Sequence, residues 1–139
     1  MTQIGIAIVE HEKSFLVGLR SDHGPLAGYH EFPGGKQNPG EALSQTATRE
    51  CLEETGVVVT AVRLMHRKSF QYDHDDLHLE FWLCKPNSCP DSQGLITPWQ
   101  WITRDQLHTL NFPPANEDLL QKLMSLEISA IDSSSDSTD

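Results

Sequence analysis

The sequence is poor in basic residues and in cysteine, and it has no long hydrophobic run. Its 10 Lys and Arg residues are outnumbered by 20 Asp and Glu residues, which gives a formal net charge of −10 at pH 7. Such a protein lacks the basic surface that duplex nucleic acid requires, so we expect no such partner. A small nucleotide is still compatible with this charge, because a chelated metal ion carries the positive charge.

The three cysteines, Cys51, Cys84 and Cys89, are odd in number and show no CxxC spacing, which predicts free thiols in a reducing compartment. The first residues show no signal pattern, and no apolar run reaches the length of a membrane span. We therefore expect a cytoplasmic monomer or homodimer with no membrane partner. The length of 139 residues predicts one domain.

Three carboxylates gather near the end of a predicted helix. Glu50, Glu53 and Glu54 are spaced i, i+3 and i+4, so a helix places them on one face. Like charges at this spacing repel, and the C-terminal end of a helix favours cations. The cluster is unfavourable for stability alone, and a bound divalent cation explains it. All-oxygen ligands favour Mg²⁺, with Mn²⁺ as an alternative.

Glycines and turn signals frame this helix. Phe32-Pro33-Gly34-Gly35 precedes it, and the paired glycines let the backbone come close to a ligand. Asn38-Pro39-Gly40 predicts a turn, and Glu41 lies at the predicted helix start, where negative charge is favoured. Gly56 follows the helix as a C-terminal cap. The stretch predicts a loop, a turn and a helix that carries its acids at the far end.

This stretch resembles the Nudix box, GX5EX7REUXEEXGU. Gly35 is followed after five residues by Glu41, and after seven more by Arg49-Glu50-Cys51, Glu53-Glu54 and Gly56-Val57. Every fixed position is filled, and only Cys51 is an unusual choice for the apolar position U. The resemblance implies a mixed α/β fold, with a mixed β-sheet sandwiched between helices. It also implies metal-dependent hydrolysis of a nucleoside diphosphate linked to another moiety.

The rest of the chain predicts strands around this helix. Strands at Ile4–Val9 and Ser14–Arg20 form a predicted hairpin, and further strands are expected at 57–62, 64–72, 77–84 and 98–102. We expect Thr103 to cap a short helical turn, followed by a rigid elbow at Phe112–Asn116 and a last helix at Glu117–Leu126. The domain is predicted at 1–127, with a disordered acidic, serine-rich tail at 128–139.

The resemblance extends beyond the box to MutT-type enzymes. Glu31–Lys36, Phe81-Trp82-Leu83 and Leu110–Asn116 carry this likeness. Enzymes of this type hydrolyse nucleoside triphosphates to monophosphate and pyrophosphate, with 8-oxo-dGTP as the characteristic substrate. Their elbow asparagine reads the oxidised guanine, and Asn116 has that position. The same residue is also suited to capping the last helix.

One position departs from the relatives, which commonly carry a further glutamate in the loop before the late tryptophan. Counted back from Trp101, Leu95 stands at that position, and Ser92–Thr97 contains no acid. Glu80 or Asp91 can substitute as a metal ligand. Glu80 falls between two apolar residues of a predicted strand, so it faces away from them, toward either a metal or solvent.

The resemblance and the side-chain chemistry together assign the site. The predicted metal ligands are the Gly34 carbonyl, Glu50, Glu53, Glu54 and Glu80, and either Glu50 or Glu53 takes the proton of the attacking water. Arg49 pairs with a box carboxylate and fixes its rotamer, although with Glu53 this is also an ordinary i,i+4 ion pair. Substrate contacts are expected from Arg20, Phe32, Gly34, Gly35, Lys36, Tyr72 and Asn116. Arg20 is alternatively a solvated strand end.

Two other functions are compatible with these residues. A Nudix hydrolase can act on another nucleotide, such as CTP, ADP-ribose or a dinucleoside polyphosphate. The proline that marks many ADP-ribose enzymes is absent from the region around Tyr72, which weakens that alternative. A catalytically idle nucleotide sensor would be expected to lack box carboxylates, and none is missing here.

Overall fold

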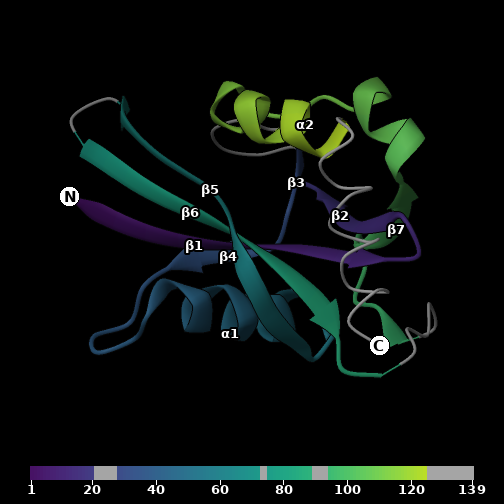
Figure 1. Ribbon diagram of the computed structural model, residues 1–139, viewed down its shortest axis with the longest axis horizontal. Coiled ribbons are helices and arrows are strands. Elements are labelled where there is room, and N and C mark those ends of the chain that lie inside the picture. The colour runs from purple at the N-terminus through teal and green to yellow at the C-terminus, as the bar shows by residue number, and fades with distance from the viewer. Residues whose placement is uncertain (21–27, 73–74, 89–93, 125–139) are drawn as a thin grey trace.

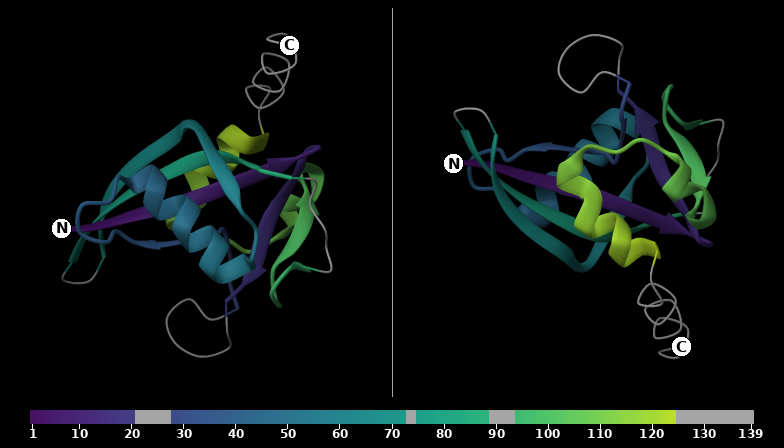
Figure 2. Two further views of the ribbon diagram at one scale, coloured as in Figure 1. Left: turned by 90° about the horizontal axis from the view of Figure 1, so that it is seen from below. Right: turned by 90° about the horizontal axis from the view of Figure 1, so that it is seen from above.

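In the computed structural model, a mixed β-sheet lies between two α-helices (Figures 1 and 2). The structure describes residues 1–20, 28–72, 75–88 and 94–124, so Cys89, Asp91 and the predicted tail at 128–139 lie outside the described residues. The strands are β1 (Thr2–His11), β2 (Ser14–Leu19), β3 (His30–Glu31), β4 (Gly34–Lys36), β5 (Val59–Tyr72), β6 (Asp75–Pro86) and β7 (Gln100–Thr103). The helices are α1 (Leu43–Thr55), the 3₁₀ turns η2 (Arg104–Thr109) and η3 (Pro114–Asn116), and α2 (Glu117–Met124). None of the helices in the described residues is long and apolar enough to cross a membrane.

The first strand, β1, organises the sheet. It pairs antiparallel with β2 and β4, and it pairs in parallel with β6 from Thr2 beside Leu77 to Val9 beside Cys84. β5 joins the far edge of β6, while β3 and β7 both pair with β2. This combination of parallel and antiparallel pairs, with a helix on each face, confirms the predicted mixed α/β class.

Alternate residues of β1 supply two separate cores. Ile8 packs into the cluster that contains Leu119 of α2, whereas Ala7 and Val9 pack into the cluster that contains Ala47 of α1. A period of two is expected for a strand that is covered on both faces. Figure 2 shows α1 crossing one face of the sheet and α2 crossing the other. The core therefore holds both helices against the same central strand.

Several predicted boundaries change in the structure. The β1–β2 hairpin is confirmed, but its turn is only Glu12 and Lys13, with φ of 51° and 65°. Residues 57–72, predicted as two strands, contain the single strand β5, whose pairing with β6 is irregular around Val62 and Met65. Gly34–Lys36, predicted as a loop, is a strand because it pairs with Ile4–Ile6 of β1.

The two cysteines in the described residues are free thiols, as predicted. Cys51 of α1 and Cys84 of β6 are both buried in the core beneath α1. Burial raises the pKa of Cys51 to about 11 and the pKa of Cys84 to about 12. Both side chains therefore stay protonated at neutral pH and serve as small apolar groups.

Candidate active site

The three predicted carboxylates lie at the C-terminal end of α1. Gly56 ends the helix in the left-handed conformation, with φ of 84°, and its N–H donates to the Leu52 carbonyl at 3.0 Å. This is the predicted C-terminal cap. The last turn contains no basic residue, so Glu50, Glu53 and Glu54 lie where the helix dipole disfavours negative charge. The end of α1 is thus acidic, and no Lys, Arg or His of its last turn balances this charge.

Glu54 is half-buried, as is Glu50, whereas Glu53 is exposed. Its Oε1 accepts a hydrogen bond from the Gly34 N–H at 3.1 Å. Burial raises the pKa of Glu54 to about 7, against the effect of this hydrogen bond, and the negative charges of Glu50, Glu31 and Glu53 also raise it. A cation close to this carboxylate would stabilise its charged form.

Arg49 holds several groups around the carboxylates. Its Nε and Nη2 donate to the two oxygens of Glu41 at 2.7 and 3.1 Å, which is a bidentate pair. Its Nη1 lies 3.1 Å from Glu53 Oε1 and 3.4 Å from Glu50 Oε2, and Nη2 also donates to the Lys36 carbonyl at 3.0 Å. The predicted contact between Arg49 and Glu53 is therefore present, but it is one of several. The bond from Arg49 to the Lys36 carbonyl also joins α1 to β4.

Glu41 was predicted at the helix start and lies just before it, because α1 begins at Leu43 and Ala42 is its N-cap. Its carboxylate accepts from the Asn38 N–H at 3.0 Å and from Thr46 Oγ1 at 2.8 Å. Together with the bond from Arg49, which is the largest effect, these contacts hold the pKa of Glu41 at about 2. Glu41 is therefore a permanently charged anchor for the guanidinium.

The paired glycines allow β4 to lie directly against α1. A Cβ added to Gly35 would collide with the carboxylate of Glu50. A Cβ added to Gly34 would lie 2.9 Å from the Cα of Ile6 in the neighbouring strand. A side chain at either position would displace the acidic cluster or the strand. Lys36, the last residue of β4, has an exposed side chain.

The short strand β3 adds an acidic residue that the sequence interpretation missed. Glu31 Oε1 lies 3.2 Å from Arg20 Nη1, and its charge is one of those that raise the pKa of Glu54. Burial raises the pKa of Glu31 itself, while Arg20 lowers it. Arg20 therefore lies at the edge of the acidic cluster. The only sequence signal for Glu31 is its place immediately before the Phe32–Gly35 segment.

Glu80 lies apart from this cluster. It stands beside Gly5 in the β1–β6 pair, and Gly35 stands on the other side of Gly5, so two strand spacings, about 10 Å, separate the backbones of Glu80 and Gly35. Its carboxylate accepts from Trp82 Nε1 at 3.0 Å and lies 3.4 Å from Arg67 Nε. These contacts point to a structural role, and its role as a metal ligand stays a prediction.

Tyr72 is also not brought to the carboxylates. It ends β5 and pairs with Asp75, at the tip of the β5–β6 hairpin. The strands run in the order β4, β1, β6 and β5, so three strand spacings, about 14 Å, separate β5 from β4. Figure 1 shows this tip beside the N-terminal end of β1. This placement gives no support to a contact between Tyr72 and a nucleotide held at Gly34.

The elbow between η2 and α2, residues 111–116, carries Asn116. This residue is only 8% exposed, and its backbone N–H donates to the Pro113 carbonyl at 2.9 Å. No residue in the described part of the chain hydrogen-bonds its side-chain amide. Phe32 is 5% exposed, and its ring stacks on Phe112 of the elbow, with centroids 4.9 Å apart. Phe32 therefore packs in the core, where it joins the elbow to β4.

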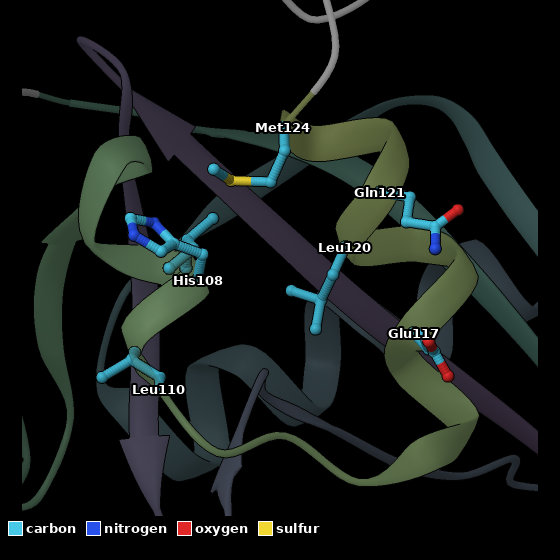
Figure 3. A pocket seen from close by; sticks show the side chains of 7 residues that line it. His108, Leu110, Glu117, Leu120, Gln121 and Met124 are labelled. Atoms are coloured by element: carbon cyan, nitrogen blue, oxygen red, sulfur yellow. The ribbon is translucent and has the colours of Figure 1, made fainter.

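A hollow of about 520 Å³ lies between η2 and α2 (Figure 3). Its lining is Leu107, His108, Leu110, Glu117, Leu120, Gln121 and Met124. Glu117, which follows Asn116 in the chain, is one of these lining residues, and α2 lies on the opposite face of the sheet from α1 (Figure 1). None of the α1 carboxylates lines it, so it is not where their chemistry takes place.

The fold and the site define a mixed α/β domain with a carboxylate cluster at the end of one helix. The chain belongs to the Nudix family, because the model of the NUDIX domain matches residues 5–122. This result confirms the family that the box motif predicts, and with it a hydrolase.

Two relatives from Escherichia coli (strain K12) cover almost the whole chain. An 8-oxo-dGTP diphosphatase is 30% identical over 125 residues, which is 89% of this chain and 97% of that protein. A CTP pyrophosphohydrolase is 27% identical over 131 residues, which is 91% of this chain and 93% of that protein. The names of these two relatives thus refer to two different nucleotides.

Solved structures show the same fold. The solution structure of the E. coli ORF135 protein matches with a TM-score of 0.75 and 25% identity, over 93% of this chain and 92% of that one. The crystal structure of a MutT protein from Methanosarcina mazei Go1 matches with a TM-score of 0.71 and 23% identity, over 88% and 91% of the two chains. The second likeness concerns the fold alone.

Proposed function

We propose that the protein hydrolyses 8-oxo-dGTP to 8-oxo-dGMP and pyrophosphate, with Mg²⁺ or Mn²⁺ as cofactor. The observation that carries the proposal is the placement of the box carboxylates beside the paired glycines, where Glu54 accepts from the Gly34 N–H and Glu50 lies against Gly35. The relative named as an 8-oxo-dGTP diphosphatase supports this choice of substrate. We place the activity in the cytoplasm, in a monomer or homodimer that removes oxidised nucleotides before they enter DNA.

The chemistry of the donors fits a divalent cation. In the described residues, no three His, Cys, Asp or Glu side chains are already gathered in a metal-binding arrangement. Arg49 contacts Glu50 and Glu53, whereas Glu54 accepts from the Gly34 N–H. All donors are nevertheless oxygens, which Mg²⁺ and Mn²⁺ prefer. A cation would also relieve the repulsion that raises the pKa of Glu54. Glu50, Glu53, Glu54 and the Gly34 carbonyl would hold it.

The residues of the site then have separate roles in hydrolysis. The bound metal supplies polarisation of a phosphoryl group and a lower pKa for the attacking water. Glu50 or Glu53 takes the proton of that water. Arg49, anchored on Glu41, keeps Glu53 in one orientation. Arg20 can exchange Glu31 for a phosphate oxygen, which a guanidinium binds with equal geometry.

Asn116 is our candidate for reading the base. Oxidation at C8 of guanine turns N7 into an N–H donor and leaves O6 as an acceptor. The Asn116 amide can accept from the first and donate to the second. Normal dGTP leaves one of these pairings unmade, which costs about 1–3 kcal/mol, or roughly 5–150-fold in discrimination. Asn116 is only 8% exposed, and its side chain has no hydrogen bond to another described residue, which is consistent with this role.

A second candidate substrate is CTP, because the relative named as a CTP pyrophosphohydrolase covers as much of the chain as the diphosphatase does. The experiment that separates the candidates is pyrophosphate release from 8-oxo-dGTP, dGTP and CTP, with Mg²⁺ and with EDTA. We expect 8-oxo-dGTP to have the highest kcat/KM, and we expect Asn116→Ala to lower that value much more than the value for dGTP. A clear preference of the wild type for CTP, or an equal loss on both guanine nucleotides, would refute the assignment.

A further inference from the structure

The elbow at residues 111–116 is fastened to β3 by an unusual pair of hydrogen bonds. The His30 N–H donates to the Asn111 carbonyl at 2.7 Å, and the Asn111 N–H donates to the imidazole Nδ1 of His30 at 3.3 Å. The His30 ring also lies 6.1 Å from the ring of Phe112, which stacks on Phe32. His30 and Phe32, which lie on either side of Glu31 in the sequence, thus both contact the elbow.

Only one of the two hydrogen bonds is independent of the residue at position 30. Any amino acid except proline can donate its backbone N–H to Asn111. The second bond needs a side-chain acceptor, and the imidazole supplies it only when Nδ1 carries no proton. The bond from the Asn111 N–H therefore selects the tautomer of the imidazole that leaves Nδ1 free to accept. The identity of this side chain, and not only the backbone, holds the start of the elbow.

The other end of the elbow is held by α2. Lys68 Nζ of β5 lies 3.0 Å from Asp118 Oδ2, and Lys122 Nζ donates to the Met65 carbonyl at 3.2 Å. Asn116 thus lies between an attachment at Asn111 and an attachment at Asp118. The chain between them contains Pro113 and Pro114, which restrict the backbone further. The attachments at Asn111 and Asp118 therefore hold Asn116 in position.

We propose that His30 is a positioning residue for substrate selection, which holds the elbow so that Asn116 presents its amide to the nucleotide base. This inference rests on the proposed function. Glu31, the next residue of β3, contacts Arg20, so one two-residue strand joins the base-reading elbow to the side where phosphate is expected. Without the His30 acceptor, the elbow must be ordered when substrate binds, and that cost weakens binding rather than slowing hydrolysis.

The test compares three variants with the wild type. His30→Ala removes the acceptor, His30→Asn restores one because its Oδ1 is as many bonds from the backbone as Nδ1, and His108→Ala removes an exposed histidine of η2 as a matched control. We expect His30→Ala to raise the KM for 8-oxo-dGTP about three- to tenfold, the range for one lost hydrogen bond, with kcat within about twofold. We expect a smaller change for dGTP, wild-type values for His108→Ala and recovery in His30→Asn.

A second measurement separates this inference from the proposed function. Hydrogen exchange of the Asn111 amide should be faster in His30→Ala than in the wild type, and the NMR signals of the Asn116 side-chain amide should shift. Both should return in His30→Asn. If the Asn116 signals do not respond to His30→Ala, or if kcat falls on both substrates alike, the positioning role is refuted. If instead those signals respond but the wild type shows no preference for the oxidised base, the tether is real and the proposed function has failed.

Discussion

Replacing Glu54 by Gln should stabilise the metal-free protein at pH 8 and leave its stability almost unchanged at pH 4. Glutamine keeps an oxygen that can accept the Gly34 N–H, so the substitution removes the charge and little else. At pH 4 the carboxyl group of Glu54 is protonated and resembles the amide. At pH 8 it is charged, half-buried and close to Glu50, Glu31 and Glu53.

The magnitude follows from the raised pKa. The pKa of Glu54 is about 7 in the folded protein, against an ordinary value of 4.5 for a glutamate. A group whose folded pKa is raised contributes its full stability below the unfolded value, so stability should be lost as the pH rises from about 4.5 to 7. The upper limit is about 3 kcal/mol, and solvent around the half-exposed side chain reduces the expected loss to about 1–2 kcal/mol.

The assay is urea unfolding in EDTA between pH 4 and pH 8, with Glu117→Gln, an exposed glutamate of α2, as the control. The free energy of unfolding should fall with pH more steeply in the wild type than in Glu54→Gln. Added Mg²⁺ should then stabilise the wild type at pH 8 and stabilise Glu54→Gln much less. Parallel pH profiles for the wild type and Glu54→Gln would show that burial of this carboxylate carries no energetic cost.

Two further predictions concern Glu53 and the packing of α1 on β1. Glu53→Gln should reduce hydrolysis by at least about a hundredfold while the melting temperature stays nearly constant, because its exposed ion pair contributes little to stability; a matching loss of both quantities would mean that the residue is structural. Gly5→Ala should cost about 1–3 kcal/mol of stability and lower the melting temperature by several degrees, since the new Cβ would collide with the Leu43 carbonyl and lie 2.9 Å from Thr46 Cβ. Gly94→Ala, where a Cβ has nothing within 4 Å, is the control, and equal effects of the two substitutions would contradict the steric argument.

Features that depend on neighbours in the sequence could be predicted. The helix is set by the spacing of its acids and by Gly56, whose φ of 84° is the left-handed conformation that a glycine cap adopts. The β1–β2 hairpin follows from two β-rich runs around a polar turn. The pairing of Arg49 with Glu53 follows from helical periodicity alone. Each of these signals lies within a few residues of the feature that it specifies.

Features that depend on distant parts of the chain could not be predicted. Gly34–Lys36 has no strand pattern of its own and becomes β4 only because Ile4–Ile6 pairs with it. The bond of Arg49 to Glu41 needs a tight return of the chain before α1, which no periodicity encodes. Glu31 lies close enough to Glu54 to raise its pKa, a proximity that no local sequence pattern encodes. Glu80 alternates with apolar residues, as an exposed position of a strand does. Its carboxylate is nevertheless largely enclosed by neighbours from β5 and β6.

The parallel pairing of β1 with β6 has a consequence for the order of events during synthesis. Each pair joins residues 75 positions apart, as Glu10 and Lys85 are, so this edge of β1 stays open until most of the domain has left the ribosome. The residues of α1 are therefore synthesised before β5 and β6 complete the sheet on which the helix packs. Such long-range closure slows folding, and a nascent chain that ends before β6 exposes an unpaired strand edge to aggregation.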